Sequence, residues 1–286
     1  RLLDCACDYG NEVEVGEGIA KAISENIVSR KDLFITSKLW NTYHRKEHVR
    51  DACLRTLKDL KLDYIDLYLV HFPISLKFVP FEHRYPPEWL HDPKAKHPKL
   101  IEDHVPIMET WRAMESLIKE KLVQNIGVAN FNTSLLRDLL NTCHIRPAVN
   151  QVEIHPYLTQ KKLIRYCRSN GIQVTSYSTF GATSYIQLGG ATASDETLND
   201  PVIQSISARH KRTPGQVILR WAVQQGLAVI PKSSKIERIR ENRELEGWQL
   251  EESDMNLIDN LNKNRRFNDP GVYAELAFNT FFPIFE

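Results

Sequence analysis

Short runs of β-branched and apolar residues alternate along the chain with longer segments in which apolar residues recur every three or four positions. The short runs predict seven strands, at residues 1–5, 33–38, 64–71, 125–130, 148–154, 172–178 and 227–233. The longer segments are typical of amphipathic helices, and the clearest lie at residues 13–24, 47–60, 107–119 and 214–225. Strands separated by single helices form parallel βαβ units with right-handed crossovers. The pattern therefore predicts an α/β fold with a parallel sheet.

Seven strands are one fewer than a (β/α)8 TIM barrel contains. Since the first predicted strand begins at residue 1, we expect the barrel's first strand to be missing from the N-terminus of this chain. No linker rich in Gly or Ser interrupts the pattern, so we predict one domain over residues 1–286. A long loop at 72–105, rich in proline and aromatic residues, is typical of an active-site loop. The apolar segment 262–286 is a candidate substrate loop. The alternative for both is a surface segment packed on itself.

Composition narrows the class of protein. A hydrophobic fraction of 42% and a charged fraction of 26% are ordinary for a globular protein with a full core. The net charge of +1 indicates neither a nucleic acid nor a membrane as partner. The longest apolar stretch, YIDLYLVHFPI, contains Asp66 and is far shorter than the roughly 20 residues of a spanning helix. Five cysteines without a CxxC motif favour a reducing compartment, so we expect a cytoplasmic protein.

Polar side chains end nearly every predicted strand. They are Asp4, Lys38, His71, Asn130, Gln151, Tyr177 and Lys232. In a parallel barrel these strand ends meet at the face where active sites lie. One such residue is ordinarily structural, but seven together indicate a functional site.

Four residues at this face form a proton-transfer set. Tyr9 is the candidate acid, although an unperturbed tyrosine has a pKa near 10 and rarely ionises. A neighbouring Lys38 ammonium favours the phenolate, and Asp4 keeps that lysine charged and in place. A tyrosine tuned in this way can donate a proton to a carbonyl oxygen as hydride arrives at the carbon. We expect His71 either to orient the carbonyl or to share the proton.

Seven blocks carry a family resemblance, in order over essentially the whole chain. The blocks RLLDCACDYGNEVEVG, LFITSKLWN, LYLVHFP, NIGVANFN, NQVEIHPY, VTSYSTFG and VIPKSSKIERIREN resemble the signature blocks of the aldo-keto reductases. The resemblance implies a (β/α)8 barrel that binds NADP(H) and reduces aldehydes and ketones. It assigns the catalytic tetrad to Asp4, Tyr9, Lys38 and His71. It also assigns Asn130 and Gln151 to the carboxamide of the nicotinamide, Tyr177 to stacking on its ring, and Ser178 and Phe180 to cofactor binding.

The stretch PKSSKIER places two cations and two hydroxyls within seven residues: Lys232, Ser233, Ser234 and Arg238. Such a cluster suits a phosphate monoester, although alone it would more often be a solvated helix start. The resemblance identifies it as the site for the 2′-phosphate of NADPH, with Glu241 and Asn242 reaching the adenine. NADH stays open as a second cofactor. The GEG stretch at Gly16–Gly18 lacks the third glycine of a dinucleotide fingerprint, and we reject that interpretation.

The loop HFPISLKFVPFEHRYPPEW and the stretch RFNDP most resemble eukaryotic D-xylose (aldose) reductases. This implies substrate contacts from Asp8, Trp40, His71 and Asn268. A helix N-cap is the alternative for Asp8. We expect no metal site, a small aldehyde or sugar as substrate, and a monomer or homodimer. Two other functions stay open: a carbonyl reductase for non-sugar aldehydes or ketones, and a non-catalytic NADP-binding member of the family.

Overall fold

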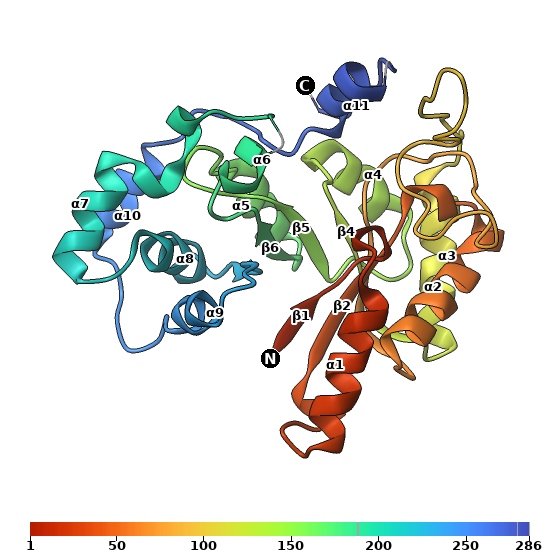
Figure 1. The fold of residues 1–286 in the computed structure, drawn as a ribbon, viewed down its shortest axis with the longest axis horizontal. Helices are drawn as coiled ribbons and strands as arrows, with labels where there is room; N and C mark the ends of the chain where they lie inside the picture. The colour runs from red at the N-terminus through yellow and green to blue at the C-terminus, as the bar shows by residue number, and fades with distance from the viewer. Residues whose placement is uncertain (188, 279, 286) are drawn as a thin grey trace. The chain divides into compact units, whose positions relative to one another are not determined.

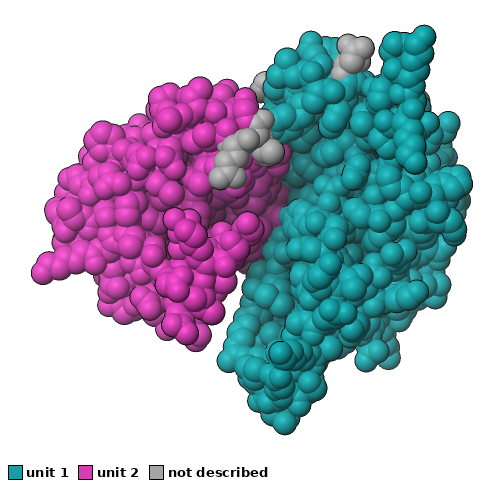
Figure 2. All heavy atoms as spheres, in the orientation of Figure 1, with its two compact units in different colours: residues 1–150, 269–286 teal, residues 151–268 magenta. Residues whose placement is uncertain are grey.

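The computed structural model of the protein describes residues 1–187, 189–278 and 280–285. Its contacts divide the chain into two compact units, coloured separately in Figure 2. Unit 1 comprises residues 1–150 and 269–286, and unit 2 comprises residues 151–268. The division falls inside strand β5 (Val149–Glu153). The prediction of a single domain stays a prediction.

Four parallel strands, each followed by a helix, build the larger part of unit 1 (Figure 1). The strands are β1 (Leu2–Asp4), β2 (Phe34–Leu39), β3 (Ile65–Val70) and β4 (Val123–Ala129). The helices are α1 (Glu12–Ser24), α2 (Lys46–Leu60), α3 (Ile107–Lys119) and α4 (Thr133–Thr142), joined by α11 (Pro270–Phe278) near the C-terminus. The pairing aligns Asp4 with Thr36 and Lys38 with Leu69, so polar residues of adjacent strands gather at the carboxyl ends.

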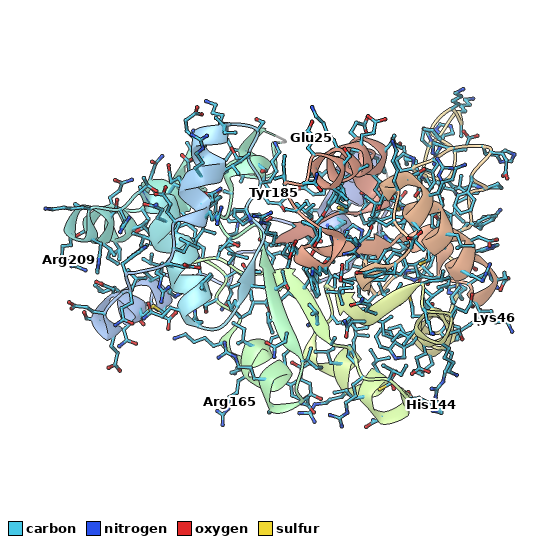
Figure 3. The ribbon with its side chains drawn as sticks, turned by 90° about the horizontal axis from the view of Figure 1, so that it is seen from below. Glu25, Lys46, His144, Arg165, Tyr185 and Arg209 are labelled. Atoms are coloured by element: carbon cyan, nitrogen blue, oxygen red, sulfur yellow. The ribbon has the colours of Figure 1, made fainter. Side chains whose placement is uncertain are left out.

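Unit 2 holds the parallel pair β6 (Gln173–Tyr177) and β7 (Ala228–Val229). Its helices are α5 (Lys161–Ser169), α6 (Thr183–Gln187), α7 (Pro201–His210), α8 (Pro214–Gln224), α9 (Ile236–Arg243) and α10 (Glu252–Asp259). Figure 3 labels Arg165 on α5 and Arg209 on α7. The strand order in the sheet follows the chain from β1 to β7. The seven predicted strands and the four clearest helices are therefore confirmed, with ends shifted by a few residues.

Gly16 explains why the GEG stretch has no part in nucleotide binding. It lies inside α1, where a Cβ atom would come within 2.4 Å of the Asp59 carbonyl oxygen and 2.7 Å of the Leu60 carbonyl carbon. Only glycine allows α1 to approach the end of α2 so closely. Helices α1 and α2 both contribute to a cluster of buried side chains: Cys5, Ile19, Leu33, Ile35 and Leu60.

The two irregular segments have different structures. The 72–105 loop contains no helix or named strand, and a single bridge joins Leu76 to Glu102. Segment 262–286 includes α11, and its residues 279 and 286 lie outside the described part of the chain. Leu76 and Leu100 of the loop pack against Ala274 of α11, so both segments share one apolar cluster within unit 1. Among the described residues, no helix combines the length and apolar character needed to cross a bilayer.

Candidate active site

Lys38 is the centre of the polar group at the carboxyl ends of β1 and β2. Its side chain is buried, and its Nζ forms an ion pair with Asp4 at the end of β1. The same nitrogen donates to the Cys5 carbonyl oxygen at 2.9 Å and to the Tyr9 hydroxyl at 3.2 Å. Three oxygens thus take the three protons of the ammonium group. The sequence predicted Asp4 and Tyr9 as neighbours of Lys38, but it gave no signal for the Cys5 carbonyl.

The charges of this group are coupled. Desolvation alone would lower the Lys38 pKa, but Asp4 and Tyr9 outweigh it and raise that pKa above its ordinary value. The Tyr9 pKa is raised, mainly by desolvation of the hydroxyl, while the Lys38 ammonium acts in the opposite direction. Both groups therefore hold their protons at neutral pH: the lysine is a cation and the tyrosine a neutral acid.

A tight turn presents Tyr9. Residues Cys7–Tyr9 form a short 3-10 helix, which Gly10 ends at a φ of 67°, donating its N–H to the Cys7 carbonyl. That left-handed conformation suits glycine. Tyr9 is 51% exposed even though its hydroxyl lies against the buried Lys38. Tyr9 is thus accessible from outside, while its hydroxyl oxygen contacts the buried Lys38 ammonium.

Asp8 lies within the same turn and is half-buried. The N-cap of α1 is Asn11, so the alternative role of Asp8 as the cap of that helix is wrong. Desolvation, with a further contribution from Glu88, raises the Asp8 pKa from 3.8 to about 7. Asp8 therefore exchanges a proton near neutral pH, and it can both donate and accept hydrogen bonds there.

His71 follows β3 and is buried beside the Tyr9 ring, with the ring centroids 6.2 Å apart. Desolvation, reinforced by Lys38 and His44, lowers the His71 pKa well below its ordinary value, so the imidazole is neutral. Its Nδ1 is buried and has no hydrogen-bond partner among the described residues. A proton on Nε2 avoids burying an N–H group without an acceptor, so we assign that tautomer. Asn130 Nδ2 donates to the His71 carbonyl oxygen at 2.8 Å, which fixes the backbone at this position.

Aromatic side chains surround His71. The Trp40 ring makes edge contacts with His71 at 5.1 Å, with Trp89 at 4.9 Å and with Phe72 at 6.3 Å between centroids. Trp40 Nε1 also donates to the Glu88 carbonyl oxygen at 3.0 Å. The 72–105 loop is therefore anchored directly beside the histidine.

Unit 2 contains the other predicted site residues, including Gln151, which is buried. Tyr177 ends β6, and its hydroxyl accepts a hydrogen bond from Asn268 Nδ2 at 3.1 Å. Desolvation, then Glu153, raises the Tyr177 pKa well above its ordinary value, so the ring stays neutral. The Ser178 hydroxyl lies 2.9 Å from that of Tyr185.

The predicted phosphate cluster surrounds the start of α9. Lys232 and Arg238 are exposed, and neither forms an ion pair with any residue in the described ranges. The Ser233 hydroxyl accepts the Lys235 N–H at 3.1 Å, while Ser234 is exposed. Two unpaired cations beside a helix start fit the phosphate monoester of NADPH.

Glu241, which was predicted to contact the adenine, lies on α9 beside the start of α8. The Glu241 carboxylate accepts the Thr213 hydroxyl proton at 2.5 Å. A Cβ atom built on Gly215 would lie 3.5 Å from the Phe180 ring and 3.7 Å from Glu241 Oε1, so the two side chains flank the start of α8. Asn242 lies next along α9. The fold thus brings Phe180 close to Glu241 within unit 2.

Two buried glutamates escaped the sequence analysis. Glu12 accepts hydrogen bonds from Ser37 at 2.6 Å and Thr56 at 3.2 Å, joining α1 to β2 and α2. Glu153 accepts the backbone N–H groups of Phe267 and Asn268. Glu12 resembles an ordinary acid in the first turn of a helix. Glu153 did leave a signal, because it stands two residues after Gln151 in a strand and so points to the same side.

Comparisons of this sequence with known proteins cover most of the chain. The sequence model of the Aldo/keto reductase family matches residues 1–263. An NADPH-dependent aldose reductase of Saccharomyces cerevisiae is 50% identical over 98% of this chain and 88% of its own length. An NAD(P)H-dependent D-xylose reductase of Pachysolen tannophilus is also 50% identical, over 96% of this chain and 86% of its own.

Solved structures agree with the sequence comparisons. The aldose reductase of Schistosoma japonicum superposes with a TM-score of 0.84 at 38% identity, covering 100% of this chain and 86% of that one. A Bombyx mori aldo-keto reductase in complex with NADP has a TM-score of 0.83 at 35% identity, covering 96% of this chain and 82% of that one.

Proposed function

The chain belongs to the aldo/keto reductase family, and we propose that it reduces the aldehyde group of an aldose such as D-xylose to the alcohol with NADPH. The observation that carries the proposal is the buried Lys38, held by Asp4 and in contact with the Tyr9 hydroxyl. A lysine this deeply buried is costly unless its charge is used or compensated. Here it contacts the hydroxyl of Tyr9, an acid whose side chain is partly exposed.

Tyr9 delivers the proton in this mechanism. Bound NADPH would supply the hydride to the carbonyl carbon. As negative charge develops on the carbonyl oxygen, the Tyr9 hydroxyl donates its proton, and the Lys38 ammonium stabilises the phenolate that remains. Asp4 keeps Lys38 in position throughout. The neutral His71 offers its Nε2 proton to the carbonyl oxygen and so orients the aldehyde.

Cofactor binding is assigned to residues whose chemistry fits NADPH. We assign the 2′-phosphate to Lys232, Ser233, Ser234 and Arg238, because two exposed cations without ion partners favour a dianion. Phe180, Glu241 and Asn242 are proposed to hold the adenosine, and Ser178 to contact the cofactor near Tyr177. The neutral Tyr177 ring would stack on the nicotinamide, and Asn130 and Gln151 would hold its carboxamide.

Sugar recognition is assigned to Asp8 and Asn268. Each sugar hydroxyl buried without a partner costs about 1–3 kcal/mol, so a sugar site needs polar side chains that donate and accept. Asp8 does both near neutral pH, and Asn268 carries an amide. Trp40 was predicted to contact the sugar, but its side chain is fully buried against His71, Phe72 and Trp89, so we assign it the support of His71 instead.

The proposal also covers the location of the protein in the cell and its oligomeric state. None of the five cysteines, all of them described residues, forms a disulfide, which is in keeping with a cytoplasmic location. A monomer or a homodimer is expected, and sedimentation at several concentrations distinguishes the two.

Initial rates test the proposed function. The purified protein is assayed with a pentose, a hexose, a uronic acid and an apolar aldehyde, each with NADPH and with NADH. We expect the highest kcat/KM for the pentose with NADPH. Preference for the apolar aldehyde would favour a general carbonyl reductase. NADPH binding without oxidation by any substrate would indicate a non-catalytic member of the family.

A further inference from the structure

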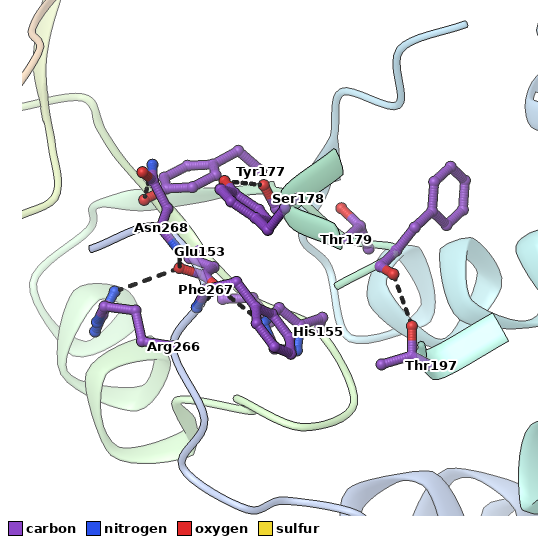
Figure 4. A network of polar contacts seen from close by, with 12 residues as sticks. Glu153, His155, Tyr177, Ser178, Thr179, Thr197, Arg266, Phe267 and Asn268 are labelled. Carbon is purple, nitrogen blue, oxygen red and sulfur yellow. Dashed lines mark hydrogen bonds and ion pairs between the residues drawn. The ribbon is translucent and has the colours of Figure 1, made fainter. Parts of the chain in front are cut away.

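Glu153 forms a polar cluster that the proposed mechanism does not use. It ends β5 and is fully buried. Its Oε1 accepts the Phe267 N–H at 2.8 Å, and its Oε2 accepts the Asn268 N–H at 2.9 Å. His155 Nε2 lies 2.8 Å from Oε1, and Arg266 lies 3.9 Å from Oε2. Figure 4 shows the carboxylate between these groups.

Such an arrangement ties a loop to a strand. A carboxylate without partners would be very costly in the interior, and two backbone N–H donors compensate for that cost. Phe267 also packs in a buried cluster with Tyr157 and Ala182. The Lys263 and Arg265 N–H groups donate to the Tyr157 carbonyl at 3.1 and 3.0 Å. The segment therefore has other anchors, and the specific effect of Glu153 falls on residues 267 and 268.

Asn268 connects Glu153 to Tyr177. Its backbone N–H is held by Glu153, and its side-chain Nδ2 donates to the Tyr177 hydroxyl at 3.1 Å. Figure 4 shows the Asn268 amide directly beside that hydroxyl. Nδ2 donates one of its two protons to Tyr177, and the carbonyl oxygen Oδ1 is the Asn268 side-chain atom that can accept a hydrogen bond from a substrate hydroxyl.

We propose that Glu153 is a positioning residue for sugar selectivity: it holds Asn268 on Tyr177 so that Asn268 Oδ1 accepts a hydrogen bond from a substrate hydroxyl. This inference rests on the proposed function. It makes selectivity depend on a buried group that touches neither substrate nor cofactor. In this arrangement Asn268 Oδ1 accepts the hydrogen bond, and the sugar hydroxyl donates it.

The test compares Glu153→Gln with a matched control, Glu115→Gln. Gln keeps the size of the side chain but turns an NH2 group toward one backbone N–H, so one of the two bonds is lost. Glu115 is also buried, and it accepts two consecutive N–H groups, from His144 at 2.7 Å and Ile145 at 2.8 Å (Figure 3 labels His144). It lies in unit 1, on α3, and is assigned no role in binding or catalysis.

The readout is the ratio of kcat/KM for D-xylose to kcat/KM for an apolar aldehyde. We expect Glu153→Gln to lower this ratio about tenfold or more, the scale of one hydrogen bond, and Glu115→Gln to leave it within about twofold. Asn268→Ala should lower the ratio as well, and adding Glu153→Gln to it should have little further effect. Equal losses for both aldehydes, or losses that multiply in the double variant, would overturn the proposal.

Amide hydrogen exchange provides a second readout that needs no activity. The exchange of the Phe267 and Asn268 amides should accelerate in Glu153→Gln and stay unchanged in Glu115→Gln. Unchanged exchange in Glu153→Gln contradicts the proposed positioning. If the wild-type protein does not reduce sugars, the proposed function fails, and exchange alone then decides whether Glu153 holds Asn268.

Tyr177→Phe covers the case in which Glu153→Gln does not fold. It removes the hydroxyl that accepts Asn268 Nδ2 but keeps the aromatic ring. At saturating NADPH the xylose ratio should fall as it does in Asn268→Ala, because a change in cofactor binding affects both aldehydes alike and cancels in the ratio. An unchanged ratio in Tyr177→Phe overturns the proposal.

Discussion

At the scale of single residues, the site depends on where protons reside. Lys38 is buried yet charged, because Asp4, the Cys5 carbonyl and Tyr9 surround its ammonium group. Tyr9 stays protonated until a substrate oxygen needs the proton. His71 is neutral, so it would orient the aldehyde through a hydrogen bond and not through a charge. The three side chains therefore have separate tasks, each decided by its surroundings.

Tyr9→Phe tests the proton donor. Because general acid catalysis contributes about 10²–10⁴-fold, kcat should fall by that order while NADPH affinity stays nearly unchanged. Stopped assays of xylitol formation and fluorescence quenching measure the two quantities. Lys38→Met should lower kcat similarly, since the phenolate loses its cation. More than a tenth of wild-type kcat in Tyr9→Phe would remove Tyr9 from this role.

Asp8 gives the stability a pH dependence of known sign. Its pKa is about 7 in the folded protein against an ordinary 3.8, so the folded state binds this proton more tightly than the unfolded state. The contribution of Asp8 to the free energy of unfolding should therefore fall as pH rises from about 4 to about 7 and stay level above. Urea titrations of wild type and Asp8→Asn measure the difference, which should be absent from the exposed control Asp63→Asn. A difference that is constant over this pH range contradicts the prediction.

At the scale of elements, four strands end at or next to a residue of the proposed site. Asp4 and Tyr177 are the last residues of β1 and β6, and His71 and Asn130 directly follow β3 and β4. Helix α9 differs, because it carries cations at an exposed start and buries no side chain in the described structure. Strands thus position the reactive groups, and a helix start is available for phosphate.

Arg238→Ala tests the role of α9. Charge-assisted hydrogen bonds contribute about 1.5–3 kcal/mol, so the affinity for NADPH should fall roughly ten- to a hundredfold. The affinity for NADH, which lacks the phosphate, should hardly change. Arg240→Ala, an equally exposed cation on the same helix, is the control. Equal weakening of both cofactors by Arg238→Ala would mean that Arg238 supports the fold of this segment only.

At the scale of the whole molecule, the family match runs through both units. The two units are continuous in β5, since residues 149 and 150 belong to unit 1 and residues 151–153 to unit 2. Because residues of this one strand belong to both units, we expect the two units to unfold together. The units should therefore behave as one thermodynamic body.

A single unfolding transition is the corresponding prediction. Thermal unfolding followed by far-UV circular dichroism and by tryptophan fluorescence should coincide, because tryptophans lie in both units, for example Trp111 and Trp221. NADPH at 100 times its Kd should add about 2.7 kcal/mol to the free energy of unfolding and raise the single Tm. Two separated transitions would show that the units unfold independently.

The sequence by itself determined the order and type of the elements and the family. Short runs of β-branched and apolar residues predicted the seven strands, because such runs are a local property of the chain. The same patterns located Asp4, Lys38, His71 and Tyr177 at strand ends. The blocks around them were sufficient to identify the family, which the comparisons confirm.

Only the tertiary structure decided which polar groups meet across long separations. The Cys5 carbonyl joins Lys38 across β1 and β2, and Glu153 meets residues more than a hundred positions away in the chain. Asp8 has an ordinary sequence context, yet its pKa is raised because folding removes it from water. Backbone carbonyls and amides look alike at every position of a sequence, and desolvation depends on what packs nearby. Such contacts and pKa shifts therefore exist only once the chain has folded.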